Sequence, residues 1–158
     1  MGSLTPEATA RVRVLRVGYR CAHVVLRLWW FIGRPHTHGV KLVIRDGEAV
    51  LFVRHSYGRR DLWELPGGGV ARDESPRQAA AREAREELGL RVSDWEGLLP
   101  AYVVKRHATA HLRVLCADYD GALLRPNAVE LLELRWAPRT APPQPLGPDA
   151  AGILKLPI

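Results

Sequence analysis

The sequence predicts an α/β fold in which a mixed β-sheet is packed by helices. Three observations lead to this expectation: a strand-turn-strand pattern around Asp46-Gly47, a well-delimited helix over residues 76–88, and further strand-like segments after that helix. The chain has 158 residues, 47% of them hydrophobic, which is enough for one domain with a core. We therefore expect an N-terminal extension over residues 1–35 and one folded domain over residues 36–158.

The extension carries an amphipathic helix over residues 11–34, which ends where Pro35 and Gly39 break the pattern. On a helical wheel its arginines form a narrow basic stripe on a broadly apolar helix. An apolar arc this wide has to be buried, so we expect packing on the protein's own sheet or on a second subunit in a homodimer. A helix lying on an anionic membrane surface is the alternative, but Phe31 falls on the basic stripe and counts against it.

The strands are read from apolar and β-branched runs bounded by turn residues. Asp46-Gly47 is suited to the tight turn of a β-hairpin. We expect strands at residues 40–44, 49–55, 62–65, 98–105, 111–120 and 131–137. Six prolines from Pro138 onward leave room for at most a short C-terminal helix.

The helix over residues 76–88 has the strongest local signals in the chain. Ser75 is a good N-cap, Pro76 suits the first helical position, and Gly89 supplies a C-terminal stop. A stripe of small or apolar residues predicts the face that packs on the sheet: Ala80, Ala81, Ala84 and Leu88. The opposite face is expected to stay open.

Three carboxylates, Glu83, Glu86 and Glu87, share an arc of about 100° on this expected open face. The arrangement opposes helix stability, because Glu83 and Glu87 are a like-charge i,i+4 pair close to the negative end of the helix dipole. It is either an ordinary solvated face, with Arg82 paired to Glu86, or a site whose chemistry needs several carboxylates together.

The spacing from the glycines to this cluster decides between these readings. Gly68 is followed after five residues by Glu74, after seven more by Arg82-Glu83, and then by Arg85, Glu86-Glu87 and Gly89-Leu90. This pattern resembles the signature of the Nudix hydrolases, the MutT-like family, over residues 62–90; the one soft departure is Ala84, where a larger aliphatic residue is more common. The resemblance implies an α/β/α sandwich with a mixed sheet and hydrolysis of a diphosphate linkage.

The resemblance also implies a metal site. Glu83 and Glu87 are the expected ligands, with Glu86 beside them and the backbone carbonyl of Gly68 completing the set. Mg²⁺ is the expected ion, with Mn²⁺ as an alternative, because carboxylate and carbonyl oxygens are the ligands that hard cations prefer. Glu83, Glu86 and Arg82, which would orient Glu83, are the expected catalytic residues, and Glu74 is expected to hydrogen-bond within the turn before the helix.

Residues outside the motif complete the expected site. An additional carboxylate acting as metal ligand is expected at Glu130 or Glu133; strand alternation places them on opposite faces, and we favour Glu130. Substrate phosphates are expected to bind basic residues at the end of the second strand and in the following loop: Arg54, His55, Arg59 and Arg60. His36 and His38 lack a partner at ligand spacing, so no metal role is expected for them.

The net charge of +6 suits anionic partners, and a nucleotide is the expected substrate. The proline associated with ADP-ribose specificity is replaced by Lys105, the tyrosine associated with dinucleoside polyphosphates by His107, and the NADH pyrophosphatase array is absent. A nucleoside di- or triphosphate leads, with other nucleoside diphosphate derivatives behind it.

Two further classes of function are weighed against the hydrolase. A non-catalytic nucleotide-sensing domain should have a broken glutamate set, whereas this one is intact. Nucleic-acid binding would call for exposed aromatic residues among the arginines. Trp29, Trp30 and Phe31 are a possible platform, but their helical context favours a core or an interface. Cys21 and Cys116 have no metal or disulfide spacing, so we expect a cytoplasmic enzyme.

Overall fold

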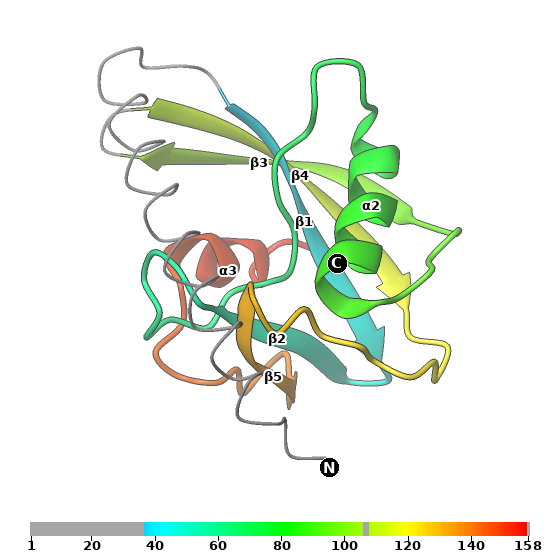
Figure 1. Cartoon of the computed structure of the whole chain (residues 1–158). Helices are drawn as coiled ribbons and strands as arrows, with labels where there is room; N and C mark the ends of the chain where they lie inside the picture. The colour runs from blue at the N-terminus through cyan, green and yellow to red at the C-terminus, as the bar shows by residue number, and fades with distance from the viewer. Residues whose placement is uncertain (1–36, 106–107, 158) are drawn as a thin grey trace.

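The computed structural model describes residues 37–105 and 108–157, so the helix expected over residues 11–34 lies outside the described residues. The elements of the described part, in chain order, are β1 (Thr37–Asp46), β2 (Ala49–His55), α2 (Pro76–Leu88), β3 (Glu96–Lys105), β4 (Ala108–Asp118), β5 (Leu131–Pro138) and α3 (Pro148–Ile153) (Figure 1). Neither of the helices described there is long and apolar enough to cross a membrane.

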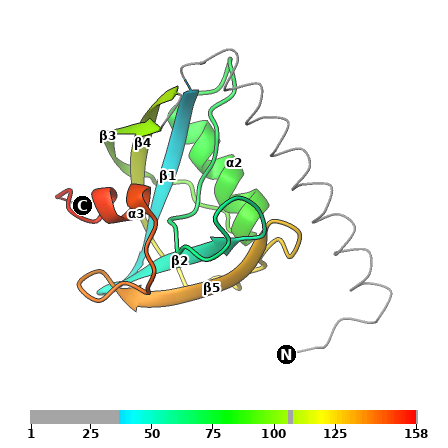
Figure 2. The ribbon, with the colours of Figure 1, turned by 90° about the vertical axis from the view of Figure 1, so that its left-hand side faces the viewer.

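The five strands form one mixed sheet in the order β3-β4-β1-β2-β5. β1 runs parallel to β4, and the other neighbouring pairs are antiparallel. Helices α2 and α3 cover opposite faces of this sheet (Figure 2), and each face has its own apolar core. The predicted α/β/α sandwich with a mixed sheet is therefore confirmed.

The hairpin between β1 and β2 is confirmed, although its turn is shifted by one residue. Asp46 pairs with Ala49, so the two turn residues are Gly47, with a φ of 56°, and Glu48. Only this pair and the next, Arg45 with Val50, join the two strands before they diverge.

The loop that follows β2 pairs with both diverging strands. Glu64 forms an isolated bridge with Val53 of β2, so the strand expected over residues 62–65 is reduced to isolated bridges. Along β1, the amide of Leu42 donates to the carbonyl of Pro66 and the amide of Val40 to that of Gly68, both at 2.9 Å. The glycines are consequently fixed to the centre of the sheet, as Figure 1 shows for the loop beside β1.

Helix α2 begins and ends where its sequence predicts. Ser75 and Gln78 form a reciprocal capping box, and Gly89 adopts the left-handed conformation that its lack of a side chain allows. The buried face differs from the expected one, because it includes Glu83 and Glu87. The expectation that the carboxylate face stays open is thus wrong for these two residues. They are covered by the loop that carries Gly67, Gly68 and Gly69, here called the glycine loop.

Candidate active site

The site is built where the glycine loop packs on α2. The carboxylate of Glu87 is 1% exposed, and its Oε2 accepts a hydrogen bond of 2.9 Å from the amide of Gly67. Glu83 lies against Gly68 so closely that a Cβ atom at position 68 would be 2.6 Å from the Glu83 carboxylate carbon. The missing side chain at Gly68 therefore makes the space in which this carboxylate sits.

Arg82 ties the loop to the helix through one guanidinium group. It binds Glu74 in a bidentate pair at 2.8 and 2.9 Å and donates to the carbonyl of Gly69 at 2.8 Å. The same group contacts Glu83 at 2.7 Å and Glu86 at 3.2 Å. Arg82 is thus placed as expected to orient Glu83, and it also fixes the loop-helix junction.

Glu74 has the structural position that the sequence predicts. One of its oxygens accepts a hydrogen bond of 3.0 Å from the amide of Ala71 within the turn before α2. The bidentate pair with Arg82, together with this amide, lowers the pKa of Glu74 to about 2. The carboxylate is therefore charged at neutral pH.

Glu130 reaches the same site from the turn before β5. The backbone of Asn127 donates to the carbonyl of Glu87 at 2.8 Å, which fastens this turn to the end of α2. Ser56, at the end of β2, fixes it from the other side: its amide donates to the Glu130 carbonyl at 2.7 Å and its hydroxyl to the Val129 carbonyl at 2.6 Å. The turn is held at both ends, and with it Glu130.

Electrostatics distinguish the two candidate outer glutamates, Glu130 and Glu133. The charge of Glu130 acts on both Glu83 and Glu87 and raises the pKa of each. Glu133 instead pairs with Arg54 at 3.6 Å and with Arg135 at 3.3 Å. The expected separation of the two glutamates is therefore observed, with Glu130 on the side of the cluster.

Negative charge is disfavoured on the buried carboxyl groups of Glu83 and Glu87. Burial raises the pKa of Glu87 to about 8, and Glu83 and Glu130 add to this effect, while the Gly67 amide and Lys41 oppose it. Burial also raises the pKa of Glu83, against the influence of Arg82. Carboxylates in such a place are stabilised by a cation, so the donor set and its electrostatics fit a divalent metal ion.

The metal position itself is not preformed. Within the described ranges, no three His, Cys, Asp or Glu side chains are already arranged around a common ion. The carbonyl of Gly68 accepts the hydrogen bond from Val40, which leaves it one lone pair for a cation. Glu86 is 49% exposed and lies at the rim. The fit thus rests on the buried carboxylates and on the space at Gly68.

Three residues at the cluster or beneath its loop were missed or misread from the sequence. His55, expected to bind phosphate, is buried with its Nδ1 atom 3.9 Å from Oε1 of Glu87. Lys41 lies under the glycine loop and donates to the carbonyl of Leu65 at 3.0 Å. Lys41 and Ser56 had no signal in the sequence, since a lone lysine in a strand and a lone serine after one are common.

The arginines expected to bind phosphate are not brought to the cluster. Arg54 lies over the ring of Trp63, 5.5 Å from its centroid, on the opposite face of β2 from His55. Arg59 pairs with Asp61 in an exposed loop, and Arg60 is exposed in the same loop. A phosphate-binding role for these three residues stays a prediction.

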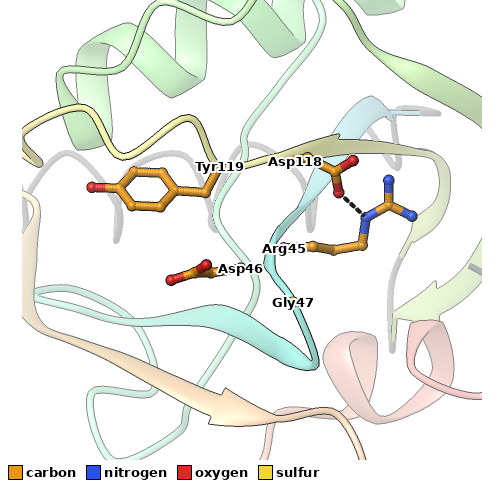
Figure 3. A pocket seen from close by; sticks show the side chains of 5 residues that line it. All are labelled: Arg45, Asp46, Gly47, Asp118 and Tyr119. Carbon is orange, nitrogen blue, oxygen red and sulfur yellow. Dashed lines mark hydrogen bonds and ion pairs between the residues drawn. The ribbon is translucent and has the colours of Figure 1, made fainter.

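Two surface hollows lie away from the carboxylates. One of about 490 Å³ is lined by Arg45, Asp46, Gly47, Asp118 and Tyr119, with Arg45 bonded to Asp118 (Figure 3). A second, of about 210 Å³, adjoins it and shares Asp118 and Tyr119. Both contain the end of β1, roughly 10 to 15 Å along the strand from Lys41, and neither contains a residue of the cluster.

An α/β/α sandwich whose glycine loop packs on a glutamate-bearing helix defines a pyrophosphohydrolase of the Nudix type. A family model described as NUDIX domain matches residues 35–156, and the chain therefore belongs to this family. A crystal structure of a MutT NUDIX hydrolase from Burkholderia pseudomallei superposes with a TM-score of 0.70 at 22% identity, over 76% of this chain and 96% of that one.

Two curated relatives carry pyrophosphohydrolase names. The ADP-ribose pyrophosphatase of Mycobacterium tuberculosis is 42% identical over 98 residues, 59% of this chain, which spans only 47% of that protein's length. The CTP pyrophosphohydrolase of Escherichia coli is 35% identical over 122 residues, covering 72% of this chain and 84% of that protein. The chain is a Nudix pyrophosphohydrolase, an enzyme that hydrolyses pyrophosphate linkages.

Proposed function

We propose that this enzyme hydrolyses a diphosphate linkage of a nucleoside di- or triphosphate and that it depends on Mg²⁺, with Mn²⁺ as a substitute. The observation that carries the proposal is the packing of Glu87 and Glu83 against Gly67 and Gly68, at a place where the charge of Glu130 acts on both carboxylates. Two buried carboxylates against a glycine loop, under the influence of a third, are unfavourable for stability and suited to a divalent ion.

Glu83, Glu87, Glu130 and the Gly68 carbonyl are the proposed metal ligands. A bound divalent ion would neutralise phosphate oxygens and lower the pKa of the attacking water. Arg82 holds the carboxylate of Glu83 in place through their 2.7 Å contact. Glu86 is the proposed proton acceptor, supported by its exposure beside Glu83.

The substrate assignment is supported by the CTP pyrophosphohydrolase, a relative whose match covers 72% of this chain. A nucleoside triphosphate is therefore the first candidate. A nucleoside diphosphate derivative such as ADP-ribose is the second, supported by the 42% identity to the ADP-ribose pyrophosphatase and opposed by Lys105 at the position of the specificity proline. The intact carboxylate set argues against a sensor that binds nucleotide without turnover.

The cellular location, assembly and partners of the protein are proposed mainly from its sequence. We propose a cytoplasmic enzyme, supported by Cys116, which is free and buried. Residues 11–34 are proposed to support a homodimer, with membrane-surface binding as the less favoured role of the same segment. Nucleic acid remains a disfavoured partner.

The test is a substrate panel with product analysis. Nucleoside triphosphates including CTP, ADP-ribose and a 5′-triphosphorylated RNA are incubated with the full chain and Mg²⁺, and products are separated by ion-exchange chromatography. We expect a nucleoside triphosphate to give the highest kcat/KM, EDTA to abolish turnover, and Glu83→Gln to lower kcat by about 100-fold or more. Nucleotide binding without turnover of any panel member would refute the hydrolase in favour of the sensor.

A further inference from the structure

His55 is a buried histidine whose side chain faces the proposed metal ligands. It ends β2 on the face covered by α2, and its side chain is 12% exposed. Its Nδ1 atom is buried and has no hydrogen-bond partner among the described residues. A buried polar atom without a partner costs on the order of 1–3 kcal/mol, so its retention calls for an explanation.

The geometry around Glu87 provides that explanation. Oε2 of this carboxylate is held by the amide of Gly67 at 2.9 Å, whereas Oε1 lies 3.9 Å from the His55 Nδ1 atom. A small rotation of the imidazole or the carboxylate closes that gap to hydrogen-bonding distance. Glu87 would then be held through both oxygens, each keeping a lone pair for a cation.

An imidazole is suited to this contact, because a ring N–H at Nδ1 can donate a hydrogen bond to a carboxylate oxygen. The imidazole ring also packs against the ring of Tyr57, whose centroid is 5.1 Å away.

We propose that His55 is a positioning residue for Glu87, donating a hydrogen bond from Nδ1 to Oε1 in the metal-loaded enzyme. The inference rests on the proposed function, since it takes Glu87 to be a metal ligand. A group that orients a ligand in this way typically contributes about 10- to 100-fold to metal affinity.

The first experiment measures Mn²⁺ affinity by electron paramagnetic resonance in four variants of the full chain. We expect His55→Leu to weaken Mn²⁺ binding by about 10- to 100-fold. His55→Asn, whose amide nitrogen can replace Nδ1 as donor, should stay within about threefold of the wild type. Val53→Ala, a truncation of a buried side chain on the same face of β2, should lower the melting temperature and leave Mn²⁺ affinity unchanged.

The fourth variant, Glu87→Gln, separates the two levels of the argument. If it binds Mn²⁺ like the wild type, the proposed metal site is wrong. If it loses Mn²⁺ while His55→Leu keeps wild-type affinity, only the role of His55 is overturned. Equal losses in His55→Leu and His55→Asn would also overturn it, because the hydrogen bond would then not be the property that matters.

A spectroscopic measurement needs no variant at all. Nitrogen-15 NMR of the Mg²⁺-loaded wild type reports which imidazole nitrogen carries the proton. The Nδ1–H tautomer supports the proposal, and the Nε2–H tautomer refutes it.

Discussion

The contact between Gly68 and Glu83 predicts an unusual pair of alanine variants. In Gly68→Ala the new methyl group would lie 2.6 Å from the Glu83 carboxylate carbon and 2.8 Å from Oε2, whereas a methyl group at Gly69 meets no atom of the described residues within 4 Å. Neither glycine has a positive φ, so the backbone accepts alanine at both positions. The two variants therefore differ in one respect, the space left for the Glu83 carboxylate.

The magnitude follows from the displacement. Relieving the overlap moves the Glu83 carboxylate by roughly 1 Å, a misplacement that can lower kcat by about 100-fold. The free energy of unfolding should change little, because Glu83 is a flexible side chain that can move. The loss of its contact with Arg82 is offset by about 0.4–1 kcal/mol, since alanine lowers the conformational entropy of the unfolded chain. Gly69→Ala gains the same unfolded-state term and should keep kcat within about threefold of the wild type.

The assay combines steady-state hydrolysis with thermal melting of the same preparations. We expect both variants to melt within a few degrees of the wild type and only Gly68→Ala to lose activity. Equal activity losses in both variants would show that loop flexibility matters rather than the space beside Glu83. Full activity in Gly68→Ala would show that Glu83 has no fixed position in the reaction.

Two further predictions concern the other carboxylates. Glu130→Gln should lower kcat by about 10-fold or more while Glu133→Gln, which only loses its pairs with Arg54 and Arg135, should remain near wild type; comparable losses in the two would contradict the assignment of Glu130. In EDTA, the free energy of unfolding of the wild type should fall, relative to that of Glu87→Gln, as pH rises from about 4.5 to about 8. The reason is that a raised pKa lets the folded state keep a proton that the unfolded state releases over this range. The difference should approach, at most, about 5 kcal/mol in urea unfolding, and parallel pH profiles would refute the burial of an uncompensated Glu87.

Local signals in the sequence determine how much of the fold can be predicted. Ser75, Pro76 and Gly89 delimit α2 correctly because capping depends on neighbouring residues alone. The turn between β1 and β2 is displaced by one residue, since Gly47 and Glu48 occupy it together. A one-residue shift of this kind depends on register, which is set by the whole sheet rather than by the dipeptide.

Burial of the carboxylates could not be predicted from periodicity. A helical wheel assigns Glu83 and Glu87 to the solvent because it knows only their polarity, while the structure buries them under the glycine loop. Strand alternation separates Glu130 from Glu133 in the sequence, but Glu130 lies in the turn before β5, so its position depends on contacts that alternation does not describe. The positions of Lys41, His55 and Ser56 could not be predicted either, since their partners come from distant parts of the chain.

Because β5 lies at the edge of the sheet, the domain can remain folded while the proposed metal site is incomplete. In the described part of the chain, β5 is an edge strand that pairs only with β2, and the turn before it carries Glu130. If this edge opens together with the hydrogen bonds that hold the turn to Glu87 and Ser56, Glu130 leaves while Glu83 and Glu87 stay on α2 and the central strands remain paired. The fraction of molecules with every ligand in place is then governed by the docking equilibrium of one strand, which is smaller in free energy than global unfolding. Heat should accordingly disperse the ligand set before it melts the domain, so that inactivation precedes the loss of secondary structure.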